Sequence, residues 1–181
     1  DKEELKMRFG LPADSPVILV MGGGQGLGPI RRIATAFQKS RFHAELIVVT
    51  GSNIKLYRQL SRKVKRHKKK ISLYRYVNHI DELMEISSLI VTKAGGLTTA
   101  EALSKGLPMV IIKPIPGQEE INTTYFLGKG AAIKITDDSL ITYVIQELLK
   151  SPSMLTQMGE AALKISKPHA SFNIAKLIIE L

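Results

Sequence analysis

The chain has 181 residues and no cysteine, so neither a disulfide framework nor a metal site with thiolate ligands can form. Long apolar runs are also absent. The longest, such as Val17 to Met21 and Met109 to Ile112, fall far below the roughly 18 residues that a membrane-spanning helix needs. The opening residues Asp-Lys-Glu-Glu lack the basic and then apolar pattern of a signal peptide. These absences predict a cytosolic protein or an excised piece of one.

Several motifs of common enzymes are missing as well. There is no Walker A sequence and no Asp-x-Asp metal motif, and the strict Rossmann spacing Gly-x-Gly-x-x-Gly fails because Leu27 stands five residues after Gly22. The second predicted strand ends in Val-Thr-Gly where a nicotinamide site needs an acidic residue. No Ser/His/Asp arrangement can be proposed, and the histidines show no metal-binding spacing. We expect His79, which follows a strand, to be exposed or hydrogen bonded instead of catalytic.

The charge is strongly positive and uneven. The formal net charge is +10, and seven Lys or Arg fall between Arg62 and Lys70. Such a block is typical of a solvated helix face or loop, and attraction to an anionic membrane surface is the second interpretation. No aromatic residue interrupts the block, and no RRM-type or zinc-finger signature occurs, so we predict no nucleic-acid partner.

Short β-branched runs alternate with amphipathic segments along most of the chain. This pattern predicts an α/β fold, with a Rossmann-like parallel sheet of about six strands and helices on both faces. At this length we expect residues 1–181 to form a single domain. The predicted strands are Val17–Met21, Glu45–Thr50, Ile71–Tyr76, Ser88–Thr92, Met109–Ile112 and Ala131–Ile135. The predicted helices between them are Ile30–Ser40, Ile54–Arg66, Ile80–Ile86, Leu97–Lys105 and Ile121–Leu127.

Both ends of the chain are predicted to be helical. Residues 1–12 indicate a short helix ended by Gly10, and after Asp137 only helical patterns remain. We expect those last helices, over 139–150, 151–165 and 169–181, to cap the sheet. In a parallel sheet the loops after the strands share one edge, where ligands bind. Five loops should therefore converge there.

The glycine-rich stretch Gly22-Gly23-Gly24-Gln25-Gly26 follows the first strand and precedes a helix. Its missing side chains would let backbone N–H groups approach a phosphate closely, although a tight strand-to-helix turn would need the same residues. Both interpretations remain open on the glycines alone.

The most informative stretch runs from Thr92 to Asn122. An apolar strand leads into Gly95-Gly96, and the helix that begins there carries Thr98 and, one turn in, Glu101. A diphosphate suits the positive end of that helix, and Glu101 could accept from two ribose hydroxyls. The loop Gln118-Glu119-Glu120 could bind sugar hydroxyls. The alternatives are a first-turn carboxylate stabilised by the helix dipole, and ordinary loop polarity in which Asn122 helps to start the next helix.

Four motifs give the chain a specific resemblance over about Val17 to Ile135: Met-Gly-Gly-Gly-Gln-Gly-Leu-Gly-Pro-Ile, Thr-Lys-Ala-Gly-Gly-Leu-Thr-Thr-Ala-Glu-Ala, Gly-Leu-Pro and Pro-Gly-Gln-Glu-Glu-x-Asn. The chain resembles the C-terminal, donor-binding half of a GT-B glycosyltransferase of family 28. Within that family it is most similar to the monogalactosyldiacylglycerol synthases and processive diacylglycerol glucosyltransferases, relatives of the peptidoglycan N-acetylglucosaminyltransferase.

The resemblance implies an inverting hexosyltransferase that uses UDP-glucose or UDP-galactose, needs no metal or other cofactor, and acts on a diacylglycerol-type acceptor at the inner face of the cell membrane. It implies contacts to the diphosphate from Gly23, Gly24, Gln25, Gly96, Leu97 and Thr98. It further implies Ile80 at the uracil, Glu101 at the ribose, and Gln118 with Glu119 at the donor sugar. The acceptor site and the general base would lie in an N-terminal domain outside this chain, so no catalytic residue is expected here.

Two other functions remain open. A UDP-sugar epimerase of the same architecture would convert the donor without an acceptor. A non-enzymatic UDP-sugar-binding subunit would serve a separate acceptor protein.

Overall fold

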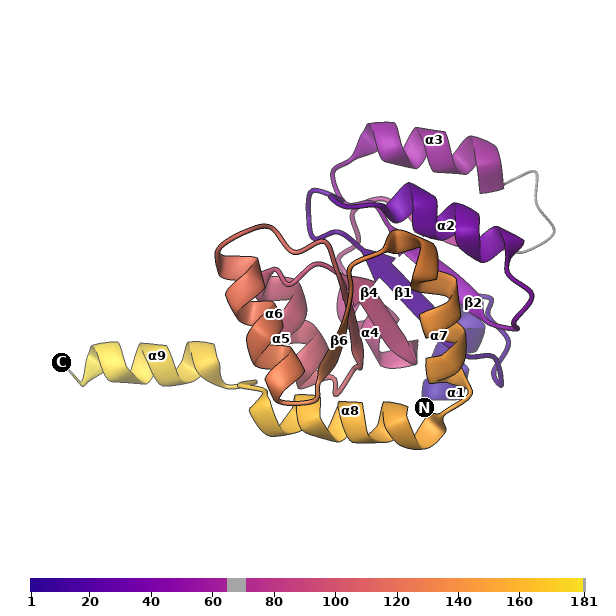
Figure 1. Cartoon of the computed structure of the whole chain (residues 1–181). Coiled ribbons are helices and arrows are strands. Elements are labelled where there is room, and N and C mark those ends of the chain that lie inside the picture. Colours follow the sequence, from indigo (N-terminus) through magenta and orange to yellow (C-terminus); the bar gives the residue numbers. More distant parts are fainter. Residues whose placement is uncertain (65–70, 181) are drawn as a thin grey trace.

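The computed structural model describes residues 1–64 and 71–180 and is built around a parallel sheet in the order β3-β2-β1-β4-β5-β6 (Figure 1). All neighbouring strands are paired in parallel. The strands are β1 (Val17–Met21), β2 (Glu45–Val49), β3 (Ile71–Tyr74), β4 (Leu89–Thr92), β5 (Met109–Ile112) and β6 (Ala132–Ile135). The predicted α/β fold with about six strands is confirmed.

Helices cover both faces of this sheet, because both faces of its strands are apolar. In β1, Val17, Leu19 and Met21 join one buried cluster, and the alternate residues Ile18 and Val20 join the other. The helices between strands are α2 (Ile30–Lys39), α3 (Ile54–Val64), α4 (Ile80–Ile86), α5 (Gly96–Ser104) and α6 (Gln118–Gly128). Those outside the strands are α1 (Lys2–Arg8), α7 (Ile141–Leu149), preceded by the short 3-10 helix η1 (Asp138–Leu140), α8 (Pro152–Ile165) and α9 (Ala170–Ile179).

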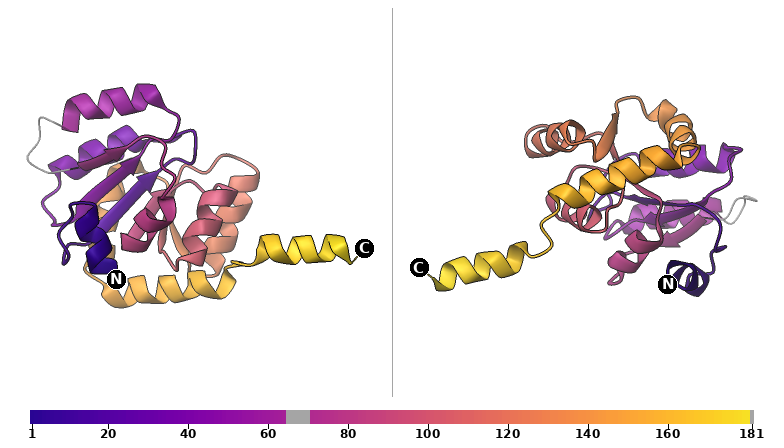
Figure 2. Two further views of the ribbon diagram at one scale, coloured as in Figure 1. Left: turned by 180° about the vertical axis from the view of Figure 1, so that it is seen from behind. Right: turned by 90° about the horizontal axis from the view of Figure 1, so that it is seen from below.

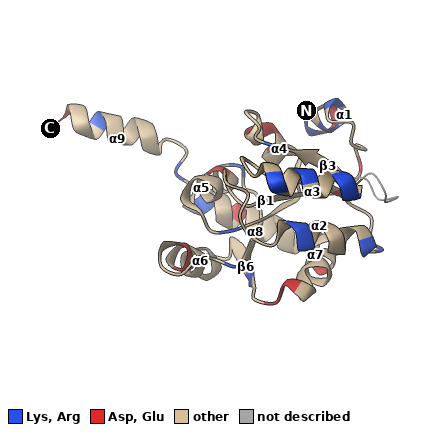
Figure 3. Ribbon diagram, turned by 90° about the horizontal axis from the view of Figure 1, so that it is seen from above, with Lys and Arg blue, Asp and Glu red and all other residues tan. Residues whose placement is uncertain are grey.

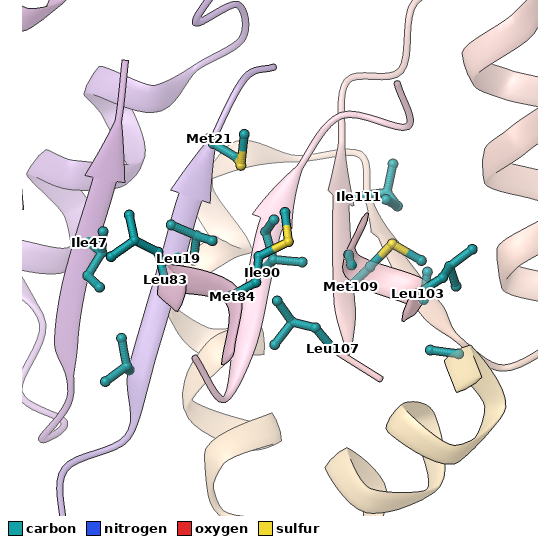
Figure 4. Close-up of a cluster of buried hydrophobic side chains, with 14 of the residues drawn as sticks. Leu19, Met21, Ile47, Leu83, Met84, Ile90, Leu103, Leu107, Met109 and Ile111 are labelled. Atoms are coloured by element: carbon teal, nitrogen blue, oxygen red, sulfur yellow. The ribbon is translucent and has the colours of Figure 1, made fainter. Parts of the chain in front are cut away.

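The two apolar clusters define the layers. One is formed with α4, α5 and α6, and Figure 4 shows its centre, where Leu83 and Met84 of α4 lie against Leu19 and Ile90 of the sheet. The other is formed with α2, α3 and α7. Helix α8 contributes to both, through Ala162 to the first and Met158 to the second. Helix α1 lies beside α4 (Figure 2).

Helix α6 begins three residues earlier than the sequence suggested. Gly117, with φ 94°, ends the preceding loop, and Gln118, Glu119 and Glu120 form the first turn instead of a polar loop. Carboxylates in a first turn are stabilised by the helix dipole, so polarity did not imply irregular structure here. Asn122 therefore does not start the helix but lies within it.

The prediction that all the C-terminal helices cap the sheet is wrong for α9. Helices α7 and α8 contribute buried residues to the apolar clusters beside the sheet, with α8 packed on α5 and α7, but α9 has no buried residue and projects from the body (Figures 1 and 2). Its exposed apolar side chains are Phe172, Ile174, Leu177, Ile178 and Ile179. An apolar helical pattern predicts a packing surface without identifying what it packs against.

The strand order reverses direction between β1 and β4, which are neighbours although β2 and β3 lie between them in sequence. At such a point the connections leave on opposite faces, so the loops diverge and leave a crevice at the carboxyl ends of the strands. The fold thus places the loops after β1 and β4 on either side of one opening.

Candidate functional site

A cavity of about 150 Å³ lies at this opening. The loops that follow β1, β2, β3 and β4 all contribute to its wall. The lining residues are Met21, Gly23, Gly24, Val49, Gly51, Tyr76, Val77, Ile80, Leu97, Thr98 and Glu101. A second cavity of about 240 Å³ adjoins it and is lined by residues 22–25, Leu27, Lys93 and residues 95–98. Gly23, Gly24, Leu97 and Thr98 line both, so the two form one continuous site.

The glycine loop after β1 packs tightly against the loop after β2. A Cβ atom on Gly26, where φ is 58°, would lie 2.1 Å from the Thr50 carbonyl oxygen. A Cβ atom on Gly51 would lie 2.2 Å from the Gly24 carbonyl oxygen, which also accepts from the backbone N–H of Ser52 at 2.8 Å. Glycine is therefore required at 26 and 51 for close packing of backbone on backbone. At Gly24, by contrast, an added Cβ atom meets nothing within 4 Å.

The turn after β4 presents backbone donors to the same space. Gly95 precedes α5, and no described side chain caps the helix. The N–H groups of Gly96, Leu97 and Thr98 occupy the first turn, where a helix offers no internal acceptor. The Thr99 hydroxyl donates to the Gly95 carbonyl at 2.8 Å and secures the turn. An uncapped helix N-terminus facing a glycine loop attracts an anion.

Glu101 lies one turn into α5, on the wall of the first cavity with Ile80 and Val77. Partial burial raises the pKa of its carboxyl group, and the negative charge of Asp81 raises it further. Leu97 lines the same cavity, and it is 84% exposed. The structure thus brings Ile80, Leu97, Thr98 and Glu101 together around one cavity.

The fifth loop, after β5, meets the turn after β4 through polar contacts. Glu119 is buried, and its carboxylate accepts from the Lys93 ammonium and from the backbone N–H of Ile115, the latter at 2.9 Å. The Asn122 amide donates to the Ala94 carbonyl at 3.0 Å. Gln118 is exposed at the start of α6. Glu119 therefore lies beside the second cavity, with both carboxylate oxygens already accepting hydrogen bonds.

Sequence reasoning missed the aromatic support of the loop after β3. His79 precedes α4, and its ring stacks on Phe9 with centroids 5.6 Å apart and meets Tyr74 edge-on at 6.4 Å. Phe9 comes from the end of α1, 70 residues away in sequence. Nothing local in the sequence signals this contact. His79 is thus packed between rings, and it does not line the cavity.

Among the described residues no cluster of three or more His, Asp or Glu side chains has the geometry to hold a metal ion. Within the same residues no helix is both long and apolar enough to cross a bilayer. The polar groups of the residues that line the cavities are backbone donors, hydroxyls, the Gln25 amide, one carboxylate and one lysine.

Comparison with known families identifies residues 17–177 as a glycosyltransferase family 28 C-terminal domain. The chain belongs to this family. A curated relative, the processive diacylglycerol β-glucosyltransferase of Bacillus cytotoxicus, is 32% identical over 181 residues, which is 99% of this chain and 46% of that protein. The chain thus spans about half the length of the curated relatives that it matches.

Solved structures agree with the assignment to this family at the level of fold. MurG from Acinetobacter baumannii superposes with a TM-score of 0.76 at 20% identity, over 99% of this chain and 53% of that protein. HepE from Anabaena in complex with UDP-glucose superposes with a TM-score of 0.66 at 15% identity, over 99% of this chain and 52% of that protein. The predicted resemblance to the C-terminal half of a GT-B glycosyltransferase is therefore confirmed.

Proposed function

We propose that this family 28 domain binds the UDP-hexose donor of an inverting glycosyltransferase that transfers a hexose to a lipid acceptor, diacylglycerol. The observation that carries the proposal is the arrangement of two different subsites around one opening. Ile80 and Glu101 lie on one wall, and the uncapped N-terminus of α5 faces the glycine loop on the other. A nucleoside needs the first set of groups and a diphosphate the second.

Each site residue then has a role. Ile80 offers backbone groups to the uracil, and Glu101 accepts from the two ribose hydroxyls. Gln118 and Glu119 contact hydroxyls of the donor sugar, for which Glu119 retains lone pairs beyond those used by Lys93 and Ile115. The diphosphate is bound by backbone groups of Gly23, Gly24, Gln25, Gly96, Leu97 and Thr98.

The chemistry follows from the charge that develops during transfer. As the bond from the anomeric carbon to phosphate breaks, negative charge grows on UDP, and fixed N–H donors aimed at it stabilise the transition state. This arrangement asks for no metal or other cofactor. The base that deprotonates the acceptor hydroxyl, and the acceptor site itself, are expected in the part of the relatives' length that this chain does not cover.

The names of these similar proteins favour glucose and diacylglycerol. The relative from Bacillus cytotoxicus is a diacylglycerol β-glucosyltransferase, and HepE is described with UDP-glucose. We therefore propose UDP-glucose as the donor ahead of UDP-galactose. An epimerase or a non-enzymatic binding subunit is less favoured, because the relative that covers nearly all of this chain is named as a transferase.

Titration calorimetry with UDP tests the proposal directly. We expect the 181-residue chain to bind UDP with a dissociation constant on the order of micromolar to millimolar, because only half of a cleft encloses the ligand. It should not transfer sugar by itself. Absence of binding at millimolar UDP would contradict the proposal, and conversion of a UDP-sugar without acceptor would support the epimerase.

We further propose that the surface of α2 and α3 contacts anionic lipid. These helices contain Lys and Arg but no Asp or Glu, and Figure 3 shows the positions of basic residues, in blue, on both of these adjacent helices. The exposed cations described there include Arg31, Arg58, Arg62 and Lys63. The rest of the basic block, residues 65–70, lies outside the described residues. Clustered cations near anionic headgroups contribute about 1 kcal/mol each before screening.

Co-sedimentation with lipid vesicles at low and at physiological salt tests this surface. We expect salt-sensitive binding to phosphatidylglycerol vesicles and little to phosphatidylcholine, with loss when Lys68, Lys69 and Lys70 are changed together to Gln. A second variant with Arg58, Arg62 and Lys63 changed to Gln tests the described face of α3. Equal binding to both lipids at both salt concentrations would leave the basic block as a solvated surface.

A further inference from the structure

Lys93 is a cation at the centre of the site for which the sequence motifs assigned no role. It directly follows β4 and lines the second cavity, between the glycine loop and the turn before α5. Its Cε atom lies 3.5 Å from the position that a Cβ atom on Gly23 would take. Its Nζ atom lies 3.9 Å from the corresponding position at Gly95. The ammonium group therefore lies between the two glycine turns that face the proposed diphosphate.

The other described residues that line the two cavities include no Lys, Arg or His. A nucleoside diphosphate carries more than one negative charge at neutral pH, and the helix dipole supplies only about half an elementary charge. Backbone donors alone leave most of that charge uncompensated in a partly buried site. A lysine placed there supplies charge-assisted N–H donors at short range, although the ion pair with Glu119 offsets part of its charge.

Glu119 holds this lysine in place. Both side chains are mostly buried, Lys93 at 19% and Glu119 at 11% exposed, and the second carboxylate oxygen of Glu119 is bound by the backbone N–H of Ile115. An ammonium group has three N–H donors. The contact with Glu119 leaves donors for a ligand in the adjoining cavity, and the pairing limits the otherwise large rotamer freedom of the lysine.

We propose that Lys93 is the cation that binds the diphosphate of the donor, and that Glu119 positions it. The inference rests on the proposed function. It assigns to one side chain, Lys93, the task of stabilising the negative charge on the UDP leaving group. It also gives Glu119 a second role beside its contact with the donor sugar. Loss of Lys93 should then affect ligands in proportion to their phosphate charge and spare the nucleoside.

Titration calorimetry with UDP, UMP and uridine separates these effects. Lys93→Met is expected to weaken the binding of UDP by about tenfold or more, that of UMP by less, and that of uridine hardly at all. Lys105→Met is the matched control, because Lys105 is the C-cap of α5, at the opposite end of this helix from Lys93, and is ion paired to Glu85 at 2.9 Å, away from both cavities. It should leave all three affinities unchanged.

A second variant removes the risk that Lys93→Met leaves Glu119 buried and unpaired. Lys93→Met combined with Glu119→Gln leaves no uncompensated charge. This double variant should lose as much UDP affinity as Lys93→Met and keep its affinity for uridine. Glu119→Gln alone keeps the lysine and should weaken UDP less. If the wild type binds UDP and the double variant binds it equally well, or loses UDP and uridine alike, the role of Lys93 is overturned while the proposed function stands. If the wild type binds no UDP, both are overturned.

Discussion

The turns after β1 and β4 have similar sequences, each a strand followed by glycines and a helix, but their glycines do different things. In the first, added Cβ atoms at Gly22 and Gly26 would lie 1.8 Å and 2.1 Å from backbone oxygens. In the second, an added Cβ atom at Gly95 would have no neighbour closer than 3.9 Å, and one at Gly96 would meet nothing within 4 Å. The first turn is a packed structure, and the second is an open one whose functional groups are side chains and free N–H donors.

The two turns look alike in sequence, but glycine is needed for close backbone packing in the first and leaves open space for a ligand in the second. Backbone-on-backbone packing fixes the shape of the glycine loop, whereas Gly24 faces the cavity with open space at its Cβ position. The turn after β4 contributes Lys93, Thr98 and Glu101, so most of the polar chemistry comes from that side. Substitutions at the packed glycines of the first turn should therefore act on stability, and those at residues with open space in either turn should act on binding.

The largest effect is expected for Gly26→Ala. The new methyl group would clash with the Thr50 carbonyl at a left-handed φ of 58°, so backbone must move. We expect a loss of about 3 kcal/mol or more in the free energy of unfolding, measured by urea denaturation. Gly24→Ala is the control in the same loop and should cost less than about 1 kcal/mol, the usual range for an unstrained surface change. Equal costs would show that the packing at 26 is not decisive.

The turn after β4 is tested by Glu101→Gln, measured against UDP and against pyrophosphate. Loss of a hydrogen bond to a charged group costs roughly 1.5 to 3 kcal/mol, so UDP affinity should fall about tenfold to a hundredfold. Pyrophosphate has no ribose, and its affinity should hardly change. An equal fall in affinity for both ligands would mean that Glu101 has a structural role and does not contact the ribose.

A smaller effect on binding is expected for Gly24→Ala and Gly96→Ala. Both positions have open space where a Cβ atom would be, and both line the second cavity. A methyl group there keeps the fold but pushes the ligand away from the backbone donors, which should cost about 1 kcal/mol in UDP binding. Gly128→Ala is the control, because its Cβ position is also open but lies at the end of α6. If both site variants bind UDP with unchanged affinity, the diphosphate does not bind beside Gly24 and Gly96.

The sequence predicted the sheet well because its strands are short, apolar on both faces and separated by amphipathic helices. Periodicity located α4 correctly and β5 to the residue. It failed at the start of α6, where Gln118 to Glu120 have the polarity of a loop but form a first helical turn. It failed again for α9, whose apolar residues have no packing partner among the described residues.

Within the site, the sequence could place residues on loops but could not show which side chains meet. The glycines, Thr98 and Glu101 were predictable because strand-to-helix turns in a parallel sheet share one edge. The pairing of Lys93 with Glu119 depends on how α6 approaches the turn after β4, 26 residues earlier in sequence. The stacking of Phe9 on His79 depends likewise on the docking of α1 beside α4.

The smallest effect concerns the stability cost of the Glu101 charge. Burial, and then the charge of Asp81, raise the pKa of this carboxyl group above its unfolded value. A raised carboxyl pKa favours folding below the unfolded pKa, and this contribution is lost as the pH rises through the folded pKa. Glu101→Gln should therefore be slightly more stable than the wild type at pH 7, with the difference vanishing near pH 4.

Urea midpoints at pH 7 and near pH 4 measure this difference in stability. The variant Asp81→Asn removes one cause of the raised Glu101 pKa, the negative charge of Asp81. With Asp81 neutral, the pKa of Glu101 should move back toward its usual range, and the gain from Glu101→Gln at pH 7 should shrink. The glycine loop has no titrating group, so Gly24→Ala should show no such pH dependence. A Glu101→Gln variant that is less stable than the wild type at pH 7 would mean that the carboxylate stabilises α5, and that the turn after β4 is built for folding as much as the turn after β1.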